Sequence, residues 1–305
     1  MVMITYGEVS KDLAYSLSKL TRIPILPKVV RRFPDNEVYV RIENTKIKGE
    51  VIYIVHSLYP DQNSNLIELF LTLDLVRDYG GIPRLILPYL AYSRQDKRFQ
   101  EGEAFSLRTI ANILKGLGVR EIITIDVHSY RKEGKYRLFS IPAKNITASR
   151  LLVDYARTLC KDFIIAGPDQ GSKHFLSNIE GKKVFLRKEK YCSRCGKNAV
   201  HCKCSYKKKE YEIRSIAPKS VKGKNVLIMD DIISSGGTMI EAVKAVKGCG
   251  ANKIMVACTH GLFLGNSLKV LKSMADIVFS TNTIKSEVAR VDVAKLLARG
   301  IIPQA

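Results

Sequence analysis

The most specific chemical pattern in the sequence lies at residues 226–238, Val-Leu-Ile-Met-Asp-Asp-Ile-Ile-Ser-Ser-Gly-Gly-Thr. An apolar run leads into two adjacent carboxylates, Asp230 and Asp231, and then into a turn of small residues that opens a helix. The backbone amides of such a turn bind phosphate together with the helix N-terminus, and glycine lets the backbone approach closely. Because carboxylates accept hydrogen bonds from vicinal hydroxyls, the pattern predicts a sugar-phosphate site. The predicted phosphate ligands are Ser234, Ser235, Gly236, Gly237 and Thr238.

Four of the seven cysteines form a second cluster, at Cys192, Cys195, Cys202 and Cys204. Four thiolates at this spacing can close around a tetrahedral Zn²⁺, so the sequence predicts a small structural zinc knuckle. The Cys-x-Cys pair is tighter than the usual two-residue spacing, and disulfides or plain reduced thiols remain alternatives. The other cysteines lie in apolar helical or strand context and are interpreted as core residues: Cys160, Cys249 and Cys258.

Apolar runs of strand length alternate with helical patterns along the chain, which is typical of βαβ units and a mostly parallel sheet. Strands are expected at 51–55, 85–87, 122–125, 163–166, 226–229, 254–258 and 277–279. Helices are expected at 65–79, 104–117, 147–160, 238–247, 267–274 and 291–299. Because the second half repeats the rhythm of the first, the sequence predicts an α/β protein of two tandem doubly wound domains.

The boundary between these domains is expected between residues 143 and 144, which gives domains 1–143 and 144–305. The last helical pattern could pack back on the first domain. One segment, 188–219, is polar, basic and rich in cysteine, and it follows neither the helical nor the strand period. A segment of that length is usually functional or disordered, and it contains a Cys-rich insert at about 190–210.

Bulk composition narrows the class of protein. The chain has 305 residues, 46% of them hydrophobic, and exceeds the usual size of a single domain. Its net charge of +21 favours acidic or polyanionic partners. Nucleic acid is not expected, because the sequence has no Trp, no RNA-reading aromatic motif and no basic arm, and a solvated basic surface explains the charge. No segment reads as a signal peptide or membrane span, which favours the cytoplasm.

The 226–238 pattern resembles the phosphoribosyl diphosphate motif shared by type I phosphoribosyltransferases and ribose-phosphate pyrophosphokinases, also called phosphoribosyl pyrophosphate synthetases. The rest of the chain favours the synthetases, with archaeal members closest, because their other motifs follow in order over essentially the whole length. These motifs are Phe33–Glu37, Pro88–Asp96, Gly102–Ser106, Thr124–His128, Gly167–Gly171, Arg187–Lys190, Thr259–Phe263 and Thr281–Thr283. An ordinary phosphoribosyltransferase lacks the first half of this chain.

The resemblance implies roles for individual residues. The residues that it implies for ATP binding are Phe33, Asp35, Glu37, Arg94 and Gln95. It implies a Mg²⁺ site at His128 and Asp169, and catalysis by Lys188 and Lys190 on a mobile loop that carries the Cys-rich insert. Lys188 has a simpler interpretation as one lysine among many on a basic loop, and Arg94 as the partner of Asp96 in a surface salt bridge.

Three positions depart from the family pattern. Lys190 stands where the family usually has Arg, and an ammonium group cannot make the same fork-shaped contact as a guanidinium. Ser172 stands where a second glycine is usual, and Asn36 replaces a glycine in the adenine loop. Neither change excludes function, because Ser is small and Asn tolerates a left-handed backbone.

The reaction implied by the resemblance is transfer of the β,γ-diphosphoryl group of MgATP to the anomeric hydroxyl of ribose 5-phosphate, giving phosphoribosyl pyrophosphate and AMP. A homo-oligomer is also implied, because the family builds its ATP site across subunits. Two alternatives remain, a phosphoribosyltransferase and a non-catalytic regulatory or nucleic-acid-binding paralogue in which the insert has replaced a working loop. Retention of Lys188 and His128 favours the enzyme.

Overall fold

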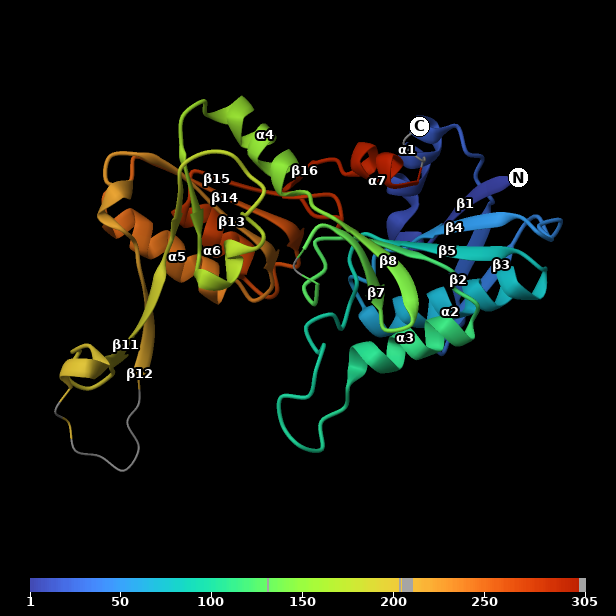
Figure 1. Ribbon diagram of the computed structural model, residues 1–305, viewed down its shortest axis with the longest axis horizontal. Helices are drawn as coiled ribbons and strands as arrows, with labels where there is room; N and C mark the ends of the chain where they lie inside the picture. The colour runs from blue at the N-terminus through green and yellow to red at the C-terminus, as the bar shows by residue number, and fades with distance from the viewer. Residues whose placement is uncertain (131, 203, 205–210, 302–305) are drawn as a thin grey trace. The chain divides into compact units, whose positions relative to one another are not determined.

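The computed structural model describes residues 1–130, 132–202, 204 and 211–301, and the chain divides into two compact units (Figure 1). Unit 1 contains Met1–Ala148 and Thr281–Ala305, and unit 2 contains Ser149–Ser280. The boundary expected between residues 143 and 144 falls inside a strand, β8 (Ile141–Ile146). That stretch pairs with the sheet of unit 1, so the chain leaves this unit only after Ala148.

The sheet of unit 1 has six strands. Their order is β1 (Val2–Tyr6), β4 (Val51–Val55), β5 (Ile82–Leu87), β6 (Ile122–Ile125), β8 and β7 (Gly134–Leu138). Neighbouring strands are parallel except for β7, which pairs with β8 in the antiparallel direction. The central strands are buried along most of their length, which explains why they read as continuous apolar runs in the sequence.

Helices cover both faces of this sheet, with α1 and α7 on one face and α2 and α3 on the other (Figure 1). Their bounds are Lys11–Thr21 for α1, Gln62–Asp78 for α2, Ser106–Gly116 for α3 and Ala294–Ile301 for α7. Leu13 and Leu17 of α1 share one buried cluster with Ala294 and Leu297 of α7. The C-terminal helix therefore completes the core of unit 1.

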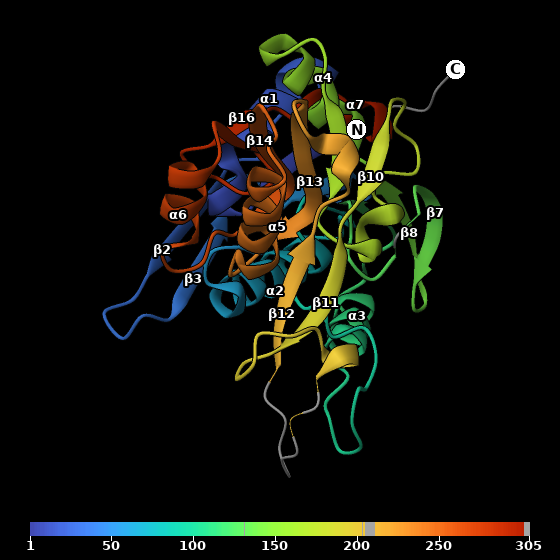
Figure 2. The same cartoon turned by 90° about the vertical axis from the view of Figure 1, so that its left-hand side faces the viewer.

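Unit 2 repeats the doubly wound plan. Its strands have the order β10 (Lys183–Phe185), β9 (Ile164–Gly167), β13 (Asn225–Ile233), β14 (Lys253–Gly261) and β15 (Ile277–Thr281). The short strand β16 (Ala289–Val291) falls in the residue range of unit 1. Neighbouring strands from β10 to β15 are parallel. One face carries α4 (Ser149–Leu159), and the other carries α5 (Gly237–Gly248) and α6 (Ser267–Met274) (Figure 2). Two α/β units with mostly parallel sheets confirm the predicted fold class.

Each strand and helix expected from the sequence overlaps an observed element, with ends that differ by a few residues. Sequence patterning missed β1, α1, β7, β8, β10, β16 and two antiparallel hairpins. One hairpin joins β2 (Lys28–Arg32) to β3 (Val38–Ile42). No helix in the described part of the chain is both long and apolar enough to span a membrane.

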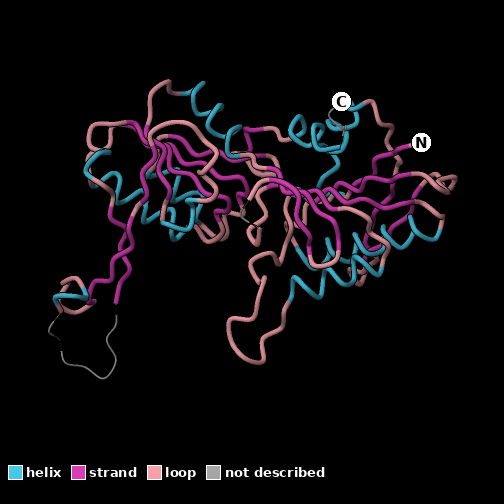
Figure 3. The backbone as a smooth tube through the Cα atoms, viewed as in Figure 1, coloured by secondary structure: helices cyan, strands magenta, loops and turns pink. Residues whose placement is uncertain are grey.

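The second hairpin corrects the expectation that the segment 188–219 lacks regular structure. Strands β11 (Arg187–Cys192) and β12 (Tyr211–Ile216) pair along their full length and project from the sheet of unit 2 (Figure 3). Most of their side chains are exposed or half-buried on both faces, so the sequence shows no alternation of polar and apolar residues. We call this pair of strands the flap hairpin. Residues 203 and 205–210 of the predicted insert lie outside the described residues.

Candidate functional site

The predicted sugar-phosphate residues follow the buried part of β13 in unit 2. Val226–Met229 lie between the parallel neighbours β9 and β14, and the chain emerges at Asp230 and Asp231, which are both half-buried. The backbone N–H of Asp231 donates to Oδ1 of Asp230 at 3.1 Å. Ligands of parallel sheets bind beyond the carboxyl ends of the strands, where these two carboxylates lie.

The turn after β13 has the backbone of an anion site. Gly236 adopts a φ of 79°, and a Cβ atom there would lie 2.7 Å from Cβ of Ser267, so the position requires glycine. Gly236 caps α5 without a side-chain hydrogen bond. The N–H groups of the first turn of α5 therefore remain to bind a ligand. The Ser234 carbonyl accepts from the N–H of Leu264 at 2.9 Å, which anchors the turn on the connection after β14.

Asp169 brings a third carboxylate to the same unit. It precedes a short 3₁₀ turn, Gln170–Lys173, and its Oδ1 accepts from the N–H of Gly171 at 2.8 Å. The departure from the family pattern at Ser172 is accommodated because residue 167 is glycine. Any other residue at position 167 would place its Cβ about 2.1 Å from Oγ of Ser172. Ser172 instead donates to the Asp169 carbonyl at 2.7 Å and holds the turn.

We call Asp169, Asp230 and Asp231 the carboxylate group. Burial, followed by the negative charge of Asp231, raises the pKa of Asp230 well above its usual value, and the charge of Asp169 acts in the same direction. A carboxyl group with this surrounding is stabilised by a cation or by donor hydroxyls. The geometry therefore suits a ligand that brings both.

Lys188 of the flap hairpin reaches the carboxylate group. Its Nζ lies 2.6 Å from Oδ2 of Asp169, and the two side chains are 39% and 27% exposed. Lys190, two residues further along β11, lies on the same face of the strand and is exposed. The structure thus brings Lys188 and Asp169 together, although the sequence predicted a catalytic role for one and a metal-binding role for the other.

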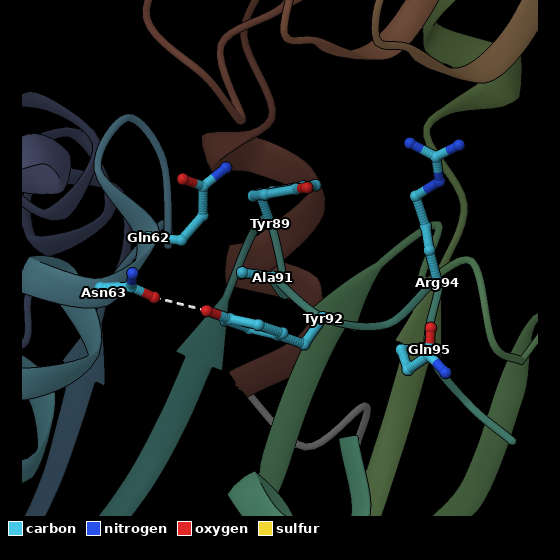
Figure 4. Close-up of a pocket in the computed structure, with 7 residues that line it drawn as sticks. All are labelled: Gln62, Asn63, Tyr89, Ala91, Tyr92, Arg94 and Gln95. Carbon is cyan, nitrogen blue, oxygen red and sulfur yellow. Dashed lines mark hydrogen bonds between the residues drawn. The ribbon is translucent and has the colours of Figure 1, made fainter. Parts of the chain in front are cut away.

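The ATP-binding residues predicted from the sequence all lie in unit 1, and two of them line a pocket of about 540 Å³ beyond the end of β5 (Figure 4). The lining residues are Gln62, Asn63, Tyr89, Ala91, Tyr92, Arg94 and Gln95. Tyr92 adopts a φ of 63°, and its hydroxyl donates to Oδ1 of Asn63 at the start of α2. A pocket of this volume is in the range of small-molecule sites.

Arg94 and Gln95 point in different directions (Figure 4). Arg94 is exposed and, among the described residues, makes no ion pair with Asp96, so the structure does not support the simpler salt-bridge interpretation. The Gln95 amide donates to Oε2 of Glu103 at 3.3 Å and so holds the loop that follows. These contacts leave Arg94 as the cationic side chain of the pocket.

Phe33, Asp35 and Glu37 lie in the turn of the β2–β3 hairpin. Phe33 is 43% exposed, and Oδ1 of Asp35 accepts from the N–H of Glu37 at 3.2 Å. Asn36 adopts a φ of 75°, the left-handed conformation that Asn tolerates. His128 follows β6 and is half-buried, so it belongs to unit 1 whereas Asp169 belongs to unit 2.

Two features escaped sequence reasoning. The first is the contribution of Gln62 and Asn63 to the pocket lining, because the sequence pointed only to the loop after β5. The run of polar residues that follows Asp61, the N-cap of α2, was the available signal for them. The other is a buried network in which Nζ of Lys28 lies 2.8 Å from Oε1 of Glu68. Burial lowers the pKa of the neighbouring His56 to about 4, so this imidazole is neutral at pH 7.

The predicted metal ligands Cys192, Cys195, Cys202 and Cys204 gather at the tip of the flap hairpin, and we call them the four-cysteine group. Their sulfur atoms all lie within 4.8 Å of one another, a set that could hold a metal ion. All seven cysteines carry free thiols. Backbone N–H groups of Cys195 and Arg194 donate to the Cys192 sulfur and lower the pKa of this thiol to about 6.

Comparisons with known proteins agree with this architecture. The model of the N-terminal domain of ribose phosphate pyrophosphokinase matches residues 2–118, and the model of the phosphoribosyl transferase domain matches residues 137–295. The protein therefore has the two domains of a phosphoribosyltransferase-like α/β enzyme.

Curated relatives match nearly the full length. A ribose-phosphate pyrophosphokinase of Methanothermobacter thermautotrophicus is 31% identical, with 97% of this chain and 98% of that protein covered. One of Sulfurisphaera tokodaii is 34% identical, with 98% and 100% covered. The crystal structure of phosphoribosylpyrophosphate synthetase from Mycobacterium smegmatis matches with a TM-score of 0.79 and 25% identity, over 98% of this chain and 97% of that one. The chain belongs to the ribose-phosphate pyrophosphokinase family.

Proposed function

We propose that this protein is a ribose-phosphate diphosphokinase, which transfers the β,γ-diphosphoryl group of ATP to the anomeric hydroxyl of ribose 5-phosphate. The observation that carries the proposal is the placement of a phosphate-binding turn, a carboxylate group and a flap lysine in one unit of a chain that matches the family over nearly its whole length. The products are phosphoribosyl pyrophosphate and AMP.

Ribose 5-phosphate is assigned to unit 2. Its phosphate would accept hydrogen bonds from the turn 234–238 and from the N-terminus of α5, whose cap Gly236 makes no side-chain hydrogen bond. Its vicinal hydroxyls would donate to Asp230 and Asp231. This orientation fixes the sugar at both ends, so that the anomeric hydroxyl is presented in one position.

ATP is assigned to unit 1, where Arg94 of the pocket would grip phosphate oxygens through its planar guanidinium. Phe33, Asp35 and Glu37 would contribute from a neighbouring subunit, so we also propose a homo-oligomer. An apolar ring left 43% exposed at the turn of a hairpin supports this. Light scattering after size exclusion would test it, because a monomer at micromolar concentration contradicts a shared ATP site.

Mg²⁺ is the cofactor that we propose, with Asp169 and His128 as ligands. The carboxylate group suits this hard cation, because it supplies oxygen ligands whose mutual repulsion a divalent ion relieves. When bound, Mg²⁺ would neutralise charge on the diphosphoryl oxygens. The four-cysteine group suits a structural Zn²⁺ instead, since thiolates are soft ligands. Reduced thiols agree with the expected cytoplasmic location.

Lys188 is the residue that we assign to the transition state. The anomeric oxygen forms a bond to the β-phosphorus while the bond to the AMP oxygen breaks, and negative charge builds on the nonbridging oxygens. Lys188 must leave Asp169 to reach that charge. Because their ion pair is partly exposed, breaking it costs little free energy. A cation that engages mainly in the transition state raises kcat.

The proposal is tested by incubating pure protein with ATP, Mg²⁺ and ribose 5-phosphate and following phosphorus resonances by NMR. AMP and a pyrophosphoryl sugar should appear together, and only when ribose 5-phosphate is present. ADP as the main product, or no turnover at any Mg²⁺ concentration, would contradict the proposed reaction.

A further inference from the structure

The turn that begins the four-cysteine group is built around sulfur. The carbonyl of Cys192 accepts from the N–H of Gly196 at 2.9 Å, and the N–H of Cys192 donates to the Lys197 carbonyl at 2.8 Å. Gly196 adopts a φ of 65°, which closes the turn. The N–H groups of Arg194 and Cys195 point at the Cys192 sulfur. Backbone donors of this kind fix and orient a metal-binding thiolate.

The sulfur spacing fits one tetrahedral ion. The sulfurs of Cys195 and Cys202 are 3.7 Å apart. A Zn–S bond of about 2.3 Å gives a tetrahedron whose sulfur–sulfur edge is about 3.8 Å. A disulfide would require two of the sulfurs to approach to about 2.05 Å, which is much shorter than the distance between Cys195 and Cys202. One ion uses all four, and soft thiolates select Zn²⁺ over Mg²⁺.

Hydrogen bonds hold the described residues of the tip, but little apolar burial supports them. Val200, in the 3₁₀ turn Ala199–His201 between the two cysteine pairs, is 85% exposed. Of the four cysteines only Cys192 is buried, so the residues of the tip that the structure describes form no apolar core of their own. A small polar segment of this kind obtains its folding free energy from metal binding.

The tip is joined to the strand that carries Lys188. Cys192 is the last residue of β11 and pairs with Tyr211, so it lies on the same face as Lys188, four residues and about 13 Å along the strand. Glu189, which follows Lys188, accepts from Nδ2 of Asn198 at 2.9 Å and from the Tyr191 hydroxyl at 3.0 Å. The cysteine-rich tip and the lysine therefore share one strand and one set of hydrogen bonds.

We propose that the four-cysteine group binds one Zn²⁺, and that this ion holds the flap hairpin in the arrangement that presents Lys188. The site itself stands on the geometry of the thiols, and only its consequence for catalysis rests on the proposed function. Zinc would act as a structural staple outside the reaction, so its loss lowers kcat and leaves ribose 5-phosphate binding to the turn of unit 2 unchanged.

The metal site is tested first without any assay of activity. Protein purified without chelator should contain about one Zn²⁺ per chain by elemental analysis. Cys195→Ser/Cys202→Ser should abolish it, whereas Cys249→Ser should retain it, because Cys249 lies outside the group and donates to the Pro218 carbonyl. Co²⁺ substitution should give the absorption bands of a tetrahedral thiolate site. Substoichiometric zinc, or zinc retained in the double variant, would overturn the site.

The coupling to the flap has its own measurement. Hydrogen exchange of the β11 amides should accelerate at least tenfold in the double variant, and kcat should fall about tenfold with an unchanged Kd for ribose 5-phosphate. Unchanged exchange in β11 after zinc loss would overturn the staple. If the wild type binds zinc but shows no turnover at all, the proposed function fails while the exchange experiment still decides the staple.

Discussion

Two lysine–carboxylate pairs, one in each unit, have nearly the same geometry and opposite surroundings. In unit 1, Nζ of Lys28 lies 2.8 Å from Oε1 of Glu68, and the side chains are 0% and 7% exposed. In unit 2, Nζ of Lys188 lies 2.6 Å from Oδ2 of Asp169, with 39% and 27% exposed. Distance therefore does not distinguish the two pairs, whereas burial does.

The buried pair is embedded in further contacts. Lys28 also donates to Oγ1 of Thr72 at 3.1 Å, and Glu68 accepts from the N–H of Glu8 at 3.0 Å. Burial by itself raises the pKa of Glu68, but the charge of His56, which is protonated only at acid pH, and the charge of Lys28 outweigh it and keep this pKa below its usual value. The buried pair cannot open without leaving a charge buried, whereas Lys188 and Asp169 can separate into solvent, as the proposed role of Lys188 requires.

Glu68→Ala should give the largest effect on stability. It leaves the Lys28 ammonium buried without its partner, which costs about 3–5 kcal/mol of the free energy of unfolding. The matched control is Asp74→Ala on the same helix, α2, which removes an exposed partner of Arg77 and should cost less than about 1 kcal/mol. Urea unfolding followed by circular dichroism measures both. Equal effects of the two substitutions would refute the distinction by burial.

Lys188→Ala should show the reverse pattern. Its exposed ion pair adds less than about 1 kcal/mol to stability, but turnover should fall about 100-fold or more because the charge acts in the transition state. The Kd for ribose 5-phosphate should stay the same. Lys244→Ala, which removes an exposed pair with Glu241 in the same unit, is the control and should leave kcat unchanged. Normal turnover in Lys188→Ala would reassign the role, with Lys190 as the next candidate.

The contrast between the two pairs also shows what the sequence could predict. The apolar strands and their order of alternation with helices were predictable, because buried parallel strands are continuous runs such as Val51–Val55. Asp230, Asp231 and the turn after them were predictable because one local segment contains the whole motif. Lys28 and Glu68 are 40 residues apart, and only the packing of α2 on the hairpin β2–β3 brings them together.

The flap hairpin limited prediction in a different way. Its strands are exposed on both faces, so no period marks them, and the contact of Lys188 with Asp169 depends on the register in which Lys188 faces Ser215. The family resemblance pointed to Lys188 as a residue, but only the paired strands show which carboxylate it meets.

Asp231→Asn should have a smaller effect than Lys188→Ala, and on binding instead of turnover. An amide keeps one acceptor oxygen but loses the charge that strengthens a hydrogen bond from a sugar hydroxyl. Affinity for ribose 5-phosphate should fall about tenfold, as measured by calorimetry without ATP. Asp154→Asn on α4, an exposed carboxylate paired with Arg157, should bind normally. A changed kcat with unchanged affinity would place Asp231 on the reacting groups and not on the diol.

The smallest expected effect is on stability, at Asp230, and its sign depends on pH. Burial and the charge of Asp231 raise the folded-state pKa of Asp230 well above the unfolded value. Below the unfolded pKa of about 3.9 both states are protonated and the carboxyl adds nothing, whereas with rising pH the unfolded state ionises first and stability falls until the folded pKa is passed. Asn cannot ionise, so Asp230→Asn should raise the melting temperature without Mg²⁺, and the gain should grow as the pH rises above the unfolded pKa.

Added Mg²⁺ and ribose 5-phosphate should reverse this ranking, because they stabilise the ionised carboxylate of the wild type more than the amide of the variant. The control is Asp162→Asn, an exposed residue whose substitution should leave the melting temperature unchanged over the same pH range. A melting temperature that falls in Asp230→Asn at neutral pH without ligands would show that this carboxylate stabilises the fold, as Glu68 does in unit 1. A melting temperature that rises in Asp230→Asn would show instead that the ionised carboxylate lowers the stability of the fold, as expected of a group that is kept for function.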